Sequence, residues 1–583
     1  MILKTVLCLV AIATVEANIP LAQILPVPQK AASTSSLHNH GPAPSESFPF
    51  QEHLNDDFTL YWNFNTTHIT FEMVVKTNGW VGFGISPKGA MKSSDVIIAW
   101  VKDGQAHFAD RHAEGHFLPA IDSSQDWTLV MAQETGQFTM LKVARPLETC
   151  DDQDVPIKPG TTRVIYAYSQ TDPSSDDAIG YHGNTRGTKS ILLLDPPTNE
   201  QHEEDLPADV KILEFTNRNV SVPSEDTTYH CTMWKLPDLG GKNHMIRYEP
   251  IIQVGHETLI HHMVLYYCSG TVSDGSFPTS DFNCYVNPPT LTYSCYNILV
   301  AWAIGGKVFN FPKNVGYPVG EANDPGIFML ETHYDNPRMR SDFVDSSGMR
   351  MYVTSQLRQH DAGIIMVGVN VDKYHIIPPY EESFLSQGIC HESCLAEGLG
   401  GQEIHVFANF LHAHLLGSKL RTRHFRNGTE LPPLQEDNNY DFDYQETRFL
   451  NEERVIKKGD SLVVECECDS TKRTGITYGG LSSREEMCES FMLYYPRTRM
   501  NFCGSRIIYK AEDQYAGRDM LDVFPTFDWT DPKVHQDFRQ TIADSEYAQI
   551  CYGNMLVFKT HLKVFPMPKI ENPYKKQDVC PLS

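Results

Sequence analysis

The stretch His405-Val-Phe-Ala-Asn-Phe-Leu-His-Ala-His-Leu-Leu-Gly417 is apolar and rich in aromatic residues, with no proline, and with glycine only at its end. This composition is typical of a β-strand. Alternate side chains of a strand point to one face, so His412 and His414 present two imidazoles side by side while Ala413 points the other way. Two neutral imidazoles at this spacing can bind one metal ion. A pair of half-buried core histidines is the alternative interpretation.

The same strand-like pattern continues along the chain in both directions. Short apolar, β-branched runs are separated by turn residues, and no long helical pattern interrupts them. They include residues 58–62, 68–75, 80–84, 96–101, 127–130 and 163–168, and further on 263–267, 327–333, 349–353, 363–371 and 461–465. The pattern predicts an all-β chain, with one β-sandwich up to about residue 190 and two packed sandwiches in the second half. Short helices are expected only near the end, over 520–524 or 533–548.

Length and composition limit the class of protein. At 583 residues the chain exceeds the ~250–300 residues at which single cores stop growing, so several domains are expected. A hydrophobic content of 41% is that of a folded globular protein. The net charge of -25 argues against nucleic-acid binding, which rewards clustered lysine and arginine.

Residues 1–17 have the features of a secretory signal peptide: Lys4, a short apolar core, and small residues before a cleavage point. No later run of about 18 apolar residues predicts a transmembrane span. Sequons at Asn65, Asn219 and Asn427 fit a glycoprotein of the secretory pathway. We therefore expect the protein in the endoplasmic reticulum or a vesicle lumen, or outside the cell, with membrane association and oligomeric state left open.

The cysteines also indicate an oxidising compartment. Cys8 would leave with the signal peptide, so thirteen of the fourteen cysteines remain. Most of them are expected in disulfide bonds, and an odd number leaves one thiol over. Metal ligation by Cys390 and Cys394, or by Cys466 and Cys468, is the less favoured alternative.

Further candidate metal ligands lie elsewhere in the chain. His261 and His262 are adjacent in an apolar strand, where neighbouring side chains normally point to opposite faces. Both can reach one metal only if the strand is twisted or ends there. His333 lies at a strand end beside a turn, and Met487 lies in a polar stretch where core packing does not explain it. A thioether is a soft ligand that favours Cu(I). Taken singly, core histidines and a surface methionine are the alternatives.

Four motifs together resemble the copper type II, ascorbate-dependent monooxygenases, and in particular the DBH-like (MOXD-type) proteins related to dopamine β-hydroxylase. These motifs are HHMVLYYC (261–268), ETHYDNP (331–337), LHAHLLG (411–417) and GGLSSREEMC (479–488). The segments at 80–101 and 110–116 resemble the DOMON domain that precedes the catalytic core in that branch. The resemblance covers essentially the whole mature chain.

The resemblance implies two copper ions per chain and ascorbate as electron donor. It implies one electron-transfer site and a second site where O₂ binds and the substrate is hydroxylated. The implied ligands are His261, His262 and His333 at the first site, and His412, His414 and Met487 at the second. It also implies catalytic roles for His412 and Tyr229, although a packed strand aromatic beside a disulfide is the alternative for Tyr229.

Phe410 bears on the substrate. Peptide-amidating members of the family carry an arginine two residues before the H-x-H pair, where it binds a carboxylate, and Phe410 cannot make that charge-assisted bond. The resemblance therefore implies a small, aromatic amine-like substrate with an activated C–H bond. A catalytically inactive secreted copper-binding or interaction protein on the same scaffold is the alternative, and the six retained ligands argue against it. A secreted zinc hydrolase is a further alternative, and it is disfavoured because this sequence has no carboxylate base near any histidine pair.

The resemblance also implies an all-β domain order and a set of disulfides. The expected parts are a signal peptide (1–17), a linker (18–45), a DOMON β-sandwich (46–190), two jelly-roll-like copper monooxygenase sandwiches (206–345 and 346–515) and a tail that packs back (516–583). The implied pairs are Cys231–Cys284, Cys268–Cys295, Cys390–Cys503, Cys466–Cys488, Cys394–Cys551 and Cys150–Cys580, which leaves Cys468 as the odd thiol. Some DOMON domains bind haem through methionine and histidine, and Met91 lies in the matching segment. A structural or interaction module is the favoured interpretation here.

Overall fold

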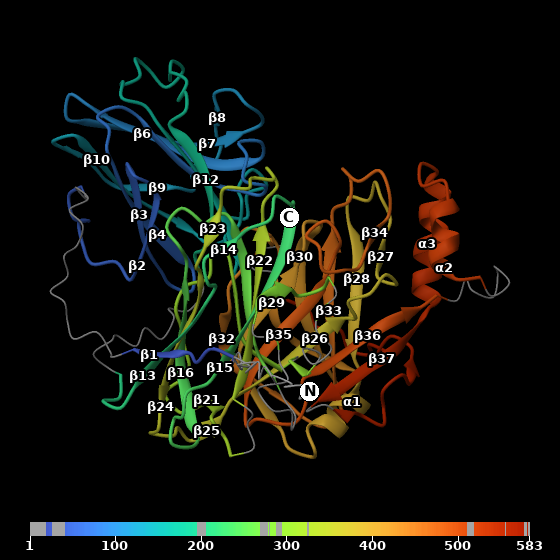
Figure 1. Cartoon of the computed structure of the whole chain (residues 1–583). Coiled ribbons are helices and arrows are strands. Elements are labelled where there is room, and N and C mark those ends of the chain that lie inside the picture. The colour runs from blue at the N-terminus through green and yellow to red at the C-terminus, as the bar shows by residue number, and fades with distance from the viewer. Residues whose placement is uncertain are drawn as a thin grey trace, which may run out of the picture. The chain divides into compact units, whose positions relative to one another are not determined.

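A computed structural model describes residues 19–25, 41–194, 206–268, 278, 280–286, 288, 294–295, 297–322, 326–509, 518–553, 556–576 and 580. The expected signal peptide, most of the first linker and the acidic stretch 199–205 lie outside the described residues. The chain divides into two compact units, one formed by Met1–Val27 with His202–Asp361 and the other by Pro28–Gln201 with Ala362–Ser583. Strands form most of the elements, which confirms the predicted all-β fold (Figure 1).

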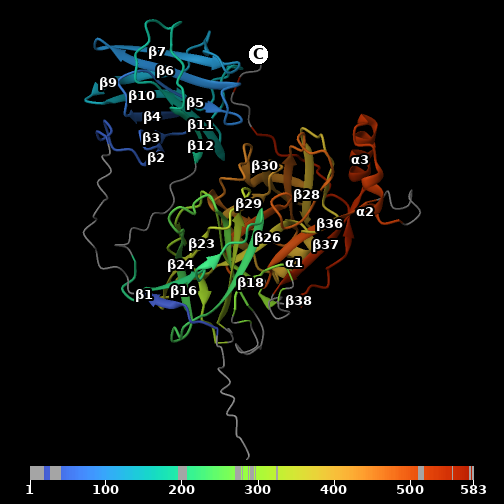
Figure 2. The ribbon, with the colours of Figure 1, turned by 45° about the horizontal axis from the view of Figure 1, so that its top comes forward.

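The N-terminal sandwich consists of two antiparallel sheets, whose strands are seen in Figure 2. One has the order β2 (Phe50–Asn55), β3 (Phe58–Phe64), β4 (His68–Val75), β10 (Phe138–Pro146) and β9 (Thr128–Thr135). The other has the order β12 (Arg186–Leu192), β11 (Thr161–Tyr168), β5 (Val81–Ser86), β6 (Ser94–Lys102), β7 (Gln105–Ala113) and β8 (Ala120–Ile121). Inward residues of both sheets, such as Phe71 and Phe83, share one core.

A second sandwich follows in the other unit. Its seven-stranded sheet has the order β1 (Gln23–Leu25), β13 (Lys211–Thr216), β24 (Gly348–Thr354), β16 (Asn243–Ile251), β21 (Val315–Val319) and β25 (His360–Asp361), with β20 (Phe309–Asn310) paired to β16. Its five-stranded sheet has the order β18 (Phe282–Asn283), β15 (Thr227–Lys235), β22 (Ile327–Asp335), β17 (Ile260–Tyr267) and β19 (Asn297–Ala303). A short ribbon joins β14 (Val220–Ser221) to β23 (Val344–Asp345). Since β24 lies between β13 and β16, the sandwich continues past the boundary expected after residue 345.

The C-terminal sandwich belongs to the same unit as the N-terminal one. Its eight-stranded sheet has the order β32 (Arg448–Ile456), β29 (Ile404–Ala413), β35 (Cys488–Tyr495), β26 (Gly363–Val369), β36 (Phe502–Ile508), β37 (Glu546–Gly553) and β38 (Leu556–Val557), with β39 (Val564–Phe565) paired to β37. A four-stranded sheet has the order β28 (Phe384–Cys390), β33 (Asp460–Cys468), β30 (Gly417–Arg426) and β31 (Thr429–Asp437), and β27 (Ile376–Ile377) pairs with β34 (Thr477–Tyr478). Leu411, Ala413 and Met492 point into the core of this sandwich.

The described helices are short. They are α1 (Glu392–Gly398), α2 (Met520–Val523), the 3₁₀ turn η5 (Phe524–Thr526) and α3 (Pro532–Asp544). Asp531 caps α3 by accepting a hydrogen bond from the Lys533 amide, and Pro532 occupies the first turn, where its missing N–H costs nothing. The helix ends before the expected residue 548 because β37 begins at Glu546. Among the described residues, none of these helices has the length and apolar character needed to cross a bilayer.

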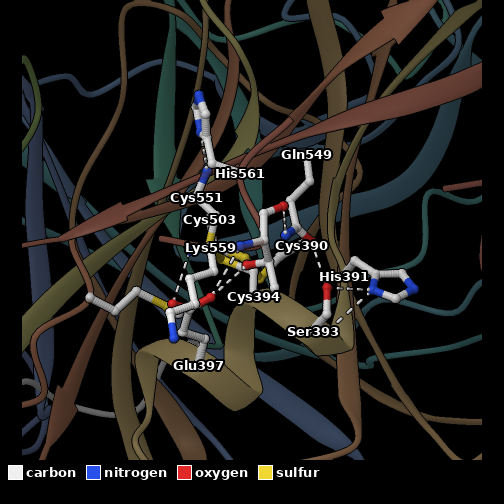
Figure 3. The surroundings of a disulfide bond; sticks show 12 residues. Cys390, His391, Ser393, Cys394, Glu397, Cys503, Gln549, Cys551, Lys559 and His561 are labelled. Atoms are coloured by element: carbon white, nitrogen blue, oxygen red, sulfur yellow. Dashed lines mark hydrogen bonds between the residues drawn. A yellow bond between two sulfur atoms is a disulfide. The ribbon is translucent and has the colours of Figure 1, made fainter. Parts of the chain in front are cut away.

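The described residues form six disulfides, and all six are the predicted pairs. Among the described cysteines, Cys468 is free, and it is buried. Figure 3 shows how two of these bonds fasten α1 and its flanking strand to the large sheet, through Cys394–Cys551 and Cys390–Cys503. The Glu397 carboxylate of the same helix accepts hydrogen bonds from the Lys559 and Thr560 amides.

A buried ion pair of the C-terminal sandwich is hydrogen-bonded to the N-terminal sandwich. The Arg448 Nη1 atom lies 2.8 Å from Asp437 Oδ2, and Thr161 of β11 donates its hydroxyl to the same carboxylate at 2.6 Å. Burial alone would raise the pKa of Asp437, but the charge of Arg448 and these hydrogen bonds hold that pKa below its ordinary value. Next to it, Arg163 donates to the Tyr440 carbonyl at 2.8 Å.

We expect Asp437→Asn to destabilise the protein by about 3 kcal/mol, because it leaves the buried Arg448 guanidinium without its counter-ion. Denaturant unfolding followed by tryptophan fluorescence measures the loss. Asp537→Asn removes a carboxylate from an exposed pair with Lys533 and should leave the midpoint unchanged. Equal midpoints for the two variants would contradict the assignment.

Candidate metal centres

The adjacent histidines His261 and His262 both face His333 because β17 begins with a β-bulge. Its pairing with β22 runs from Ile260 opposite Tyr334 directly to His262 opposite His333, so His261 is the additional residue of the bulge. A bulge bends the strand and redirects its side chains. The strand distortion that these adjacent histidines require is therefore a bulge of one residue, rather than a twist or a strand end.

The three imidazoles converge through their Nδ1 atoms. The distance between Nδ1 atoms is 3.2 Å for His261 and His262 and 3.3 Å for His262 and His333. Ligand atoms of all three residues lie within 4.8 Å of one another. Nitrogen ligands at about 2.0 Å from one metal in a tetrahedral arrangement are about 3.3 Å apart. The donor set and its spacing therefore fit a metal ion such as copper.

Tyr229 packs against this cluster. It lies on β15 directly opposite His333, and the two rings are stacked with centroids 4.5 Å apart and planes 11° apart. Its ring also contacts Tyr285, at a centroid distance of 5.1 Å, and the Tyr285 hydroxyl donates to the Glu331 carboxylate at 2.7 Å. Burial raises the pKa of Glu331 to about 7. The Tyr229 ring thus limits the orientations open to His333.

The pairing of β29 with β35 brings the strand that bears His412 next to the segment that precedes β35 and bears Met487. Phe410 lies opposite Phe491, His412 opposite Glu489 and Ala413 opposite Cys488. Directly beyond the paired strands, His414 and Met487 donate their amides to the same Glu486 carboxylate. Residues opposite each other on paired strands point to the same face. This face is the one turned away from the core that Leu411 and Ala413 fill.

Hydrogen bonds fix the ring orientation of both histidines. His412 Nδ1 lies 2.8 Å from the Gln445 side-chain oxygen, and His414 Nδ1 lies 3.2 Å from the Glu485 carbonyl. An oxygen acceptor at Nδ1 requires the proton there, so Nε2 carries the lone pair that a metal needs. Burial lowers the pKa of His412 to about 4, which keeps its imidazole neutral at ordinary pH.

Glu486 links the backbone at His414 to the backbone at Met487 through hydrogen bonds. Its buried carboxylate accepts hydrogen bonds from the amides of His414, Leu416 and Met487, the last two at 2.8 and 2.9 Å. The disulfide Cys466–Cys488 anchors the residue after Met487. On the strand's other flank, the Tyr440 hydroxyl binds both the amide and the carbonyl of Ala413.

Sequence reasoning missed three residues of this site: Gln445, Glu486 and Glu489. Gln445 and Glu486 act on the histidine strand from loops, and no spacing rule links them to it. Glu489 lies two residues after Met487 in a strand, so alternation alone would have placed it on the same face. It is 3% exposed, and burial raises its pKa to about 8.

The N-terminal sandwich has a separate cavity of about 830 Å³. Met91 lies in its wall, together with Trp80, His116 and His182. The His182 ring contacts the Gly183 carbonyl through Nδ1 at 3.0 Å. The favoured interpretation of this domain as a structural or interaction module stays a prediction.

Comparisons with known proteins agree with the order of the three sandwiches. Residues 213–341 match the copper type II ascorbate-dependent monooxygenase N-terminal domain, residues 360–516 its C-terminal domain, and residues 54–169 the DOMON domain. DBH-like monooxygenase protein 1 of Gallus gallus is 37% identical over 558 residues, covering 90% of this chain and 88% of that protein. The human protein of that name is 38% identical over 513 residues, with 83% of each chain covered. Dopamine beta-hydroxylase of Bos taurus is 33% identical over 473 residues, covering 80% of this chain and 77% of that protein.

We expect Gln445→Leu to weaken metal binding at the His412 centre about 10- to 100-fold, because the acceptor that orients the His412 ring is lost. Copper titration against a competing chelator measures the change, and the affinity of the three-histidine centre should stay the same. Gln402→Leu makes the same chemical change at an exposed turn and serves as control. Unchanged affinity at both centres would contradict the role of Gln445.

Proposed function

Because the chain belongs to the copper type II ascorbate-dependent monooxygenases, we propose that it hydroxylates an activated C–H bond of a small, aromatic amine-like molecule with copper, ascorbate and O₂. The observation that carries this proposal is the placement of His412 and His414 on one sheet face opposite the segment that bears Met487. Met487 is half-buried there, in a position that core packing does not require.

The two donor sets support different tasks. We propose that His261, His262 and His333 hold an electron-transfer copper, and that His412, His414 and Met487 hold the copper at which O₂ reacts. Three imidazoles suit a metal that only passes electrons, whereas a weakly donating thioether favours the reduced ion. Copper at both sites would supply the two single electrons, taken from ascorbate, that cleavage of O₂ requires.

The chain's own residues prepare this chemistry. Burial keeps the His412 imidazole neutral and ready to bind metal, and Gln445 holds the proton on its Nδ1 atom. Phe410 is 5% exposed, and its ring lies parallel to that of His412 at a centroid distance of 6.0 Å. An apolar ring at this place favours an aromatic substrate body over a peptide carboxylate.

We also infer a place in the secretory pathway. Six disulfides join distant parts of the chain, including Cys150–Cys580 over a sequence separation of 430 residues. Such bonds persist in the oxidising conditions of that pathway.

Replacing Met487 by alanine tests the mechanism. We expect Met487→Ala to lower ascorbate-dependent oxygen consumption more than about 100-fold, because the second copper loses one of its three protein ligands. The copper content should fall from two ions per chain towards one, as measured by metal analysis.

Met131→Ala, a similar truncation on β9 of the N-terminal sandwich, should leave both quantities unchanged. Equal oxygen consumption in wild type and Met487→Ala would sink the proposed mechanism.

The catalytic role of Tyr229 is a proposal with its own test. Tyr229→Phe keeps the ring stacked on His333 but removes the hydroxyl. If that hydroxyl takes part in proton transfer, we expect kcat to fall about 100-fold with copper content unchanged. Steady-state kinetics and metal analysis check this. Normal turnover in Tyr229→Phe, with a loss only in Tyr229→Ala, would assign the residue to packing.

A further inference from the structure

Glu489 is a carboxyl group in an unexpected position. It lies directly opposite His412 on paired strands and therefore points to the same face of the sheet. The Cβ atoms of such a pair are ~5 Å apart. Along the same face, Phe410 and Phe491 form the preceding pair, with their rings in contact at a centroid distance of 5.6 Å.

The Glu489 carboxyl is buried, and one of its oxygens has no hydrogen-bond donor among the described residues. Glu489 is 3% exposed, and its Oε1 atom has no hydrogen-bond donor among the described residues. No ion pair within the described part of the chain includes it. A buried carboxyl oxygen normally has a hydrogen-bond donor, so this one is open to a donor that a ligand brings.

Neither backbone anchoring nor close metal ligation accounts for Glu489. Glu486, its neighbour in sequence, accepts hydrogen bonds from three backbone amides and holds the strand end in place. Glu489 has no such set in the described structure. It is also absent from the described groups of three or more ligand atoms that gather within 4.8 Å, so it does not join His412 and His414 as a third close ligand.

We propose that the Glu489 carboxylate binds the ammonium group of the substrate and so selects cationic amines. This inference rests on the proposed function and deepens it, since it names the residue that recognises the amine. A cation beside a buried carboxyl favours the ionised form and forms a charge-assisted hydrogen bond. The ammonium group then supplies the donor to Oε1 that the described residues do not provide.

The neighbours of Glu489 fit such a ligand. Residues two apart in a strand are about 7 Å apart, so the Phe410–Phe491 pair lies within reach of an aromatic ring joined to the amine by a short chain. On the opposite flank, β26 presents Gly368, which brings no side chain to cover the carboxyl. A Cβ atom added there would lie 2.3 Å from the Cys488 carbonyl oxygen, so glycine is required. Because Glu489 is next to His412, the C–H bonds nearest the metal centre are those of carbons close to the nitrogen.

The isosteric variant Glu489→Gln tests this role with two substrates. We expect KM for phenethylamine to rise about 10- to 100-fold, because a hydrogen bond between charged groups is replaced by a neutral contact. KM for the uncharged 2-phenylethanol should stay the same, and so should the copper content per chain. Glu452→Gln removes an exposed carboxylate from β32, two strands away in the same sheet, and should change neither KM. Equal effects on the two substrates, or none on either, would overturn the inference.

Binding without turnover separates this inference from the proposed function. Calorimetric titration of phenethylamine into the copper-loaded full chain, without ascorbate and O₂, should show binding to wild type and at least about tenfold weaker binding to Glu489→Gln. Equal affinities, or no binding to wild type, would overturn the role of Glu489. If wild type binds the amine selectively but no compound is oxidised with ascorbate and O₂, the proposed function fails while the amine site stands.

Discussion

The Glu486 carboxylate is the constraint on which the proposed second metal centre depends. One buried side chain receives the amides of His414, Leu416 and Met487, which come from segments about seventy residues apart in the sequence. The histidine strand and the methionine segment are therefore held by a common anchor, and the disulfide Cys466–Cys488 fixes the same segment covalently. A weak thioether ligand becomes useful only when its position is imposed in this way, because its own bond to metal is too weak to order a loop.

Burial determines the chemistry on both sides of this anchor. The low pKa of His412 leaves a neutral nitrogen donor, while the Oε1 atom of Glu489 on the facing strand has no hydrogen-bond donor among the described residues. The same low-dielectric surroundings thus keep a nitrogen donor available at His412 and leave the Glu489 carboxyl open to a ligand that brings its own hydrogen-bond donor. Sheet register places the Cβ atoms of His412 and Glu489 ~5 Å apart.

The sequence allowed the fold class, the six disulfides and the candidate ligands to be predicted because each of them leaves a local or familial pattern. Alternation placed His412 and His414 on one face, and the family motifs implied the cysteine pairs. The means by which His261 and His262 come to one side was not predictable, since a β-bulge depends on the pairing partner rather than on the strand itself. Gln445 and Glu486 were missed for a similar reason: their roles arise from tertiary hydrogen bonds that no spacing indicates.

Tyr440 links the N-terminal sandwich to the strand that bears the proposed metal ligands. Its hydroxyl binds both backbone groups of Ala413, between the two histidines, while its carbonyl accepts a hydrogen bond from Arg163 of the N-terminal sandwich. Gln445, which orients His412, follows five residues later on the same loop. Hydrogen bonds through Tyr440 thus link the N-terminal sandwich to the backbone between the two proposed ligands, so a partner bound to this domain would act on the proposed metal centre through this loop.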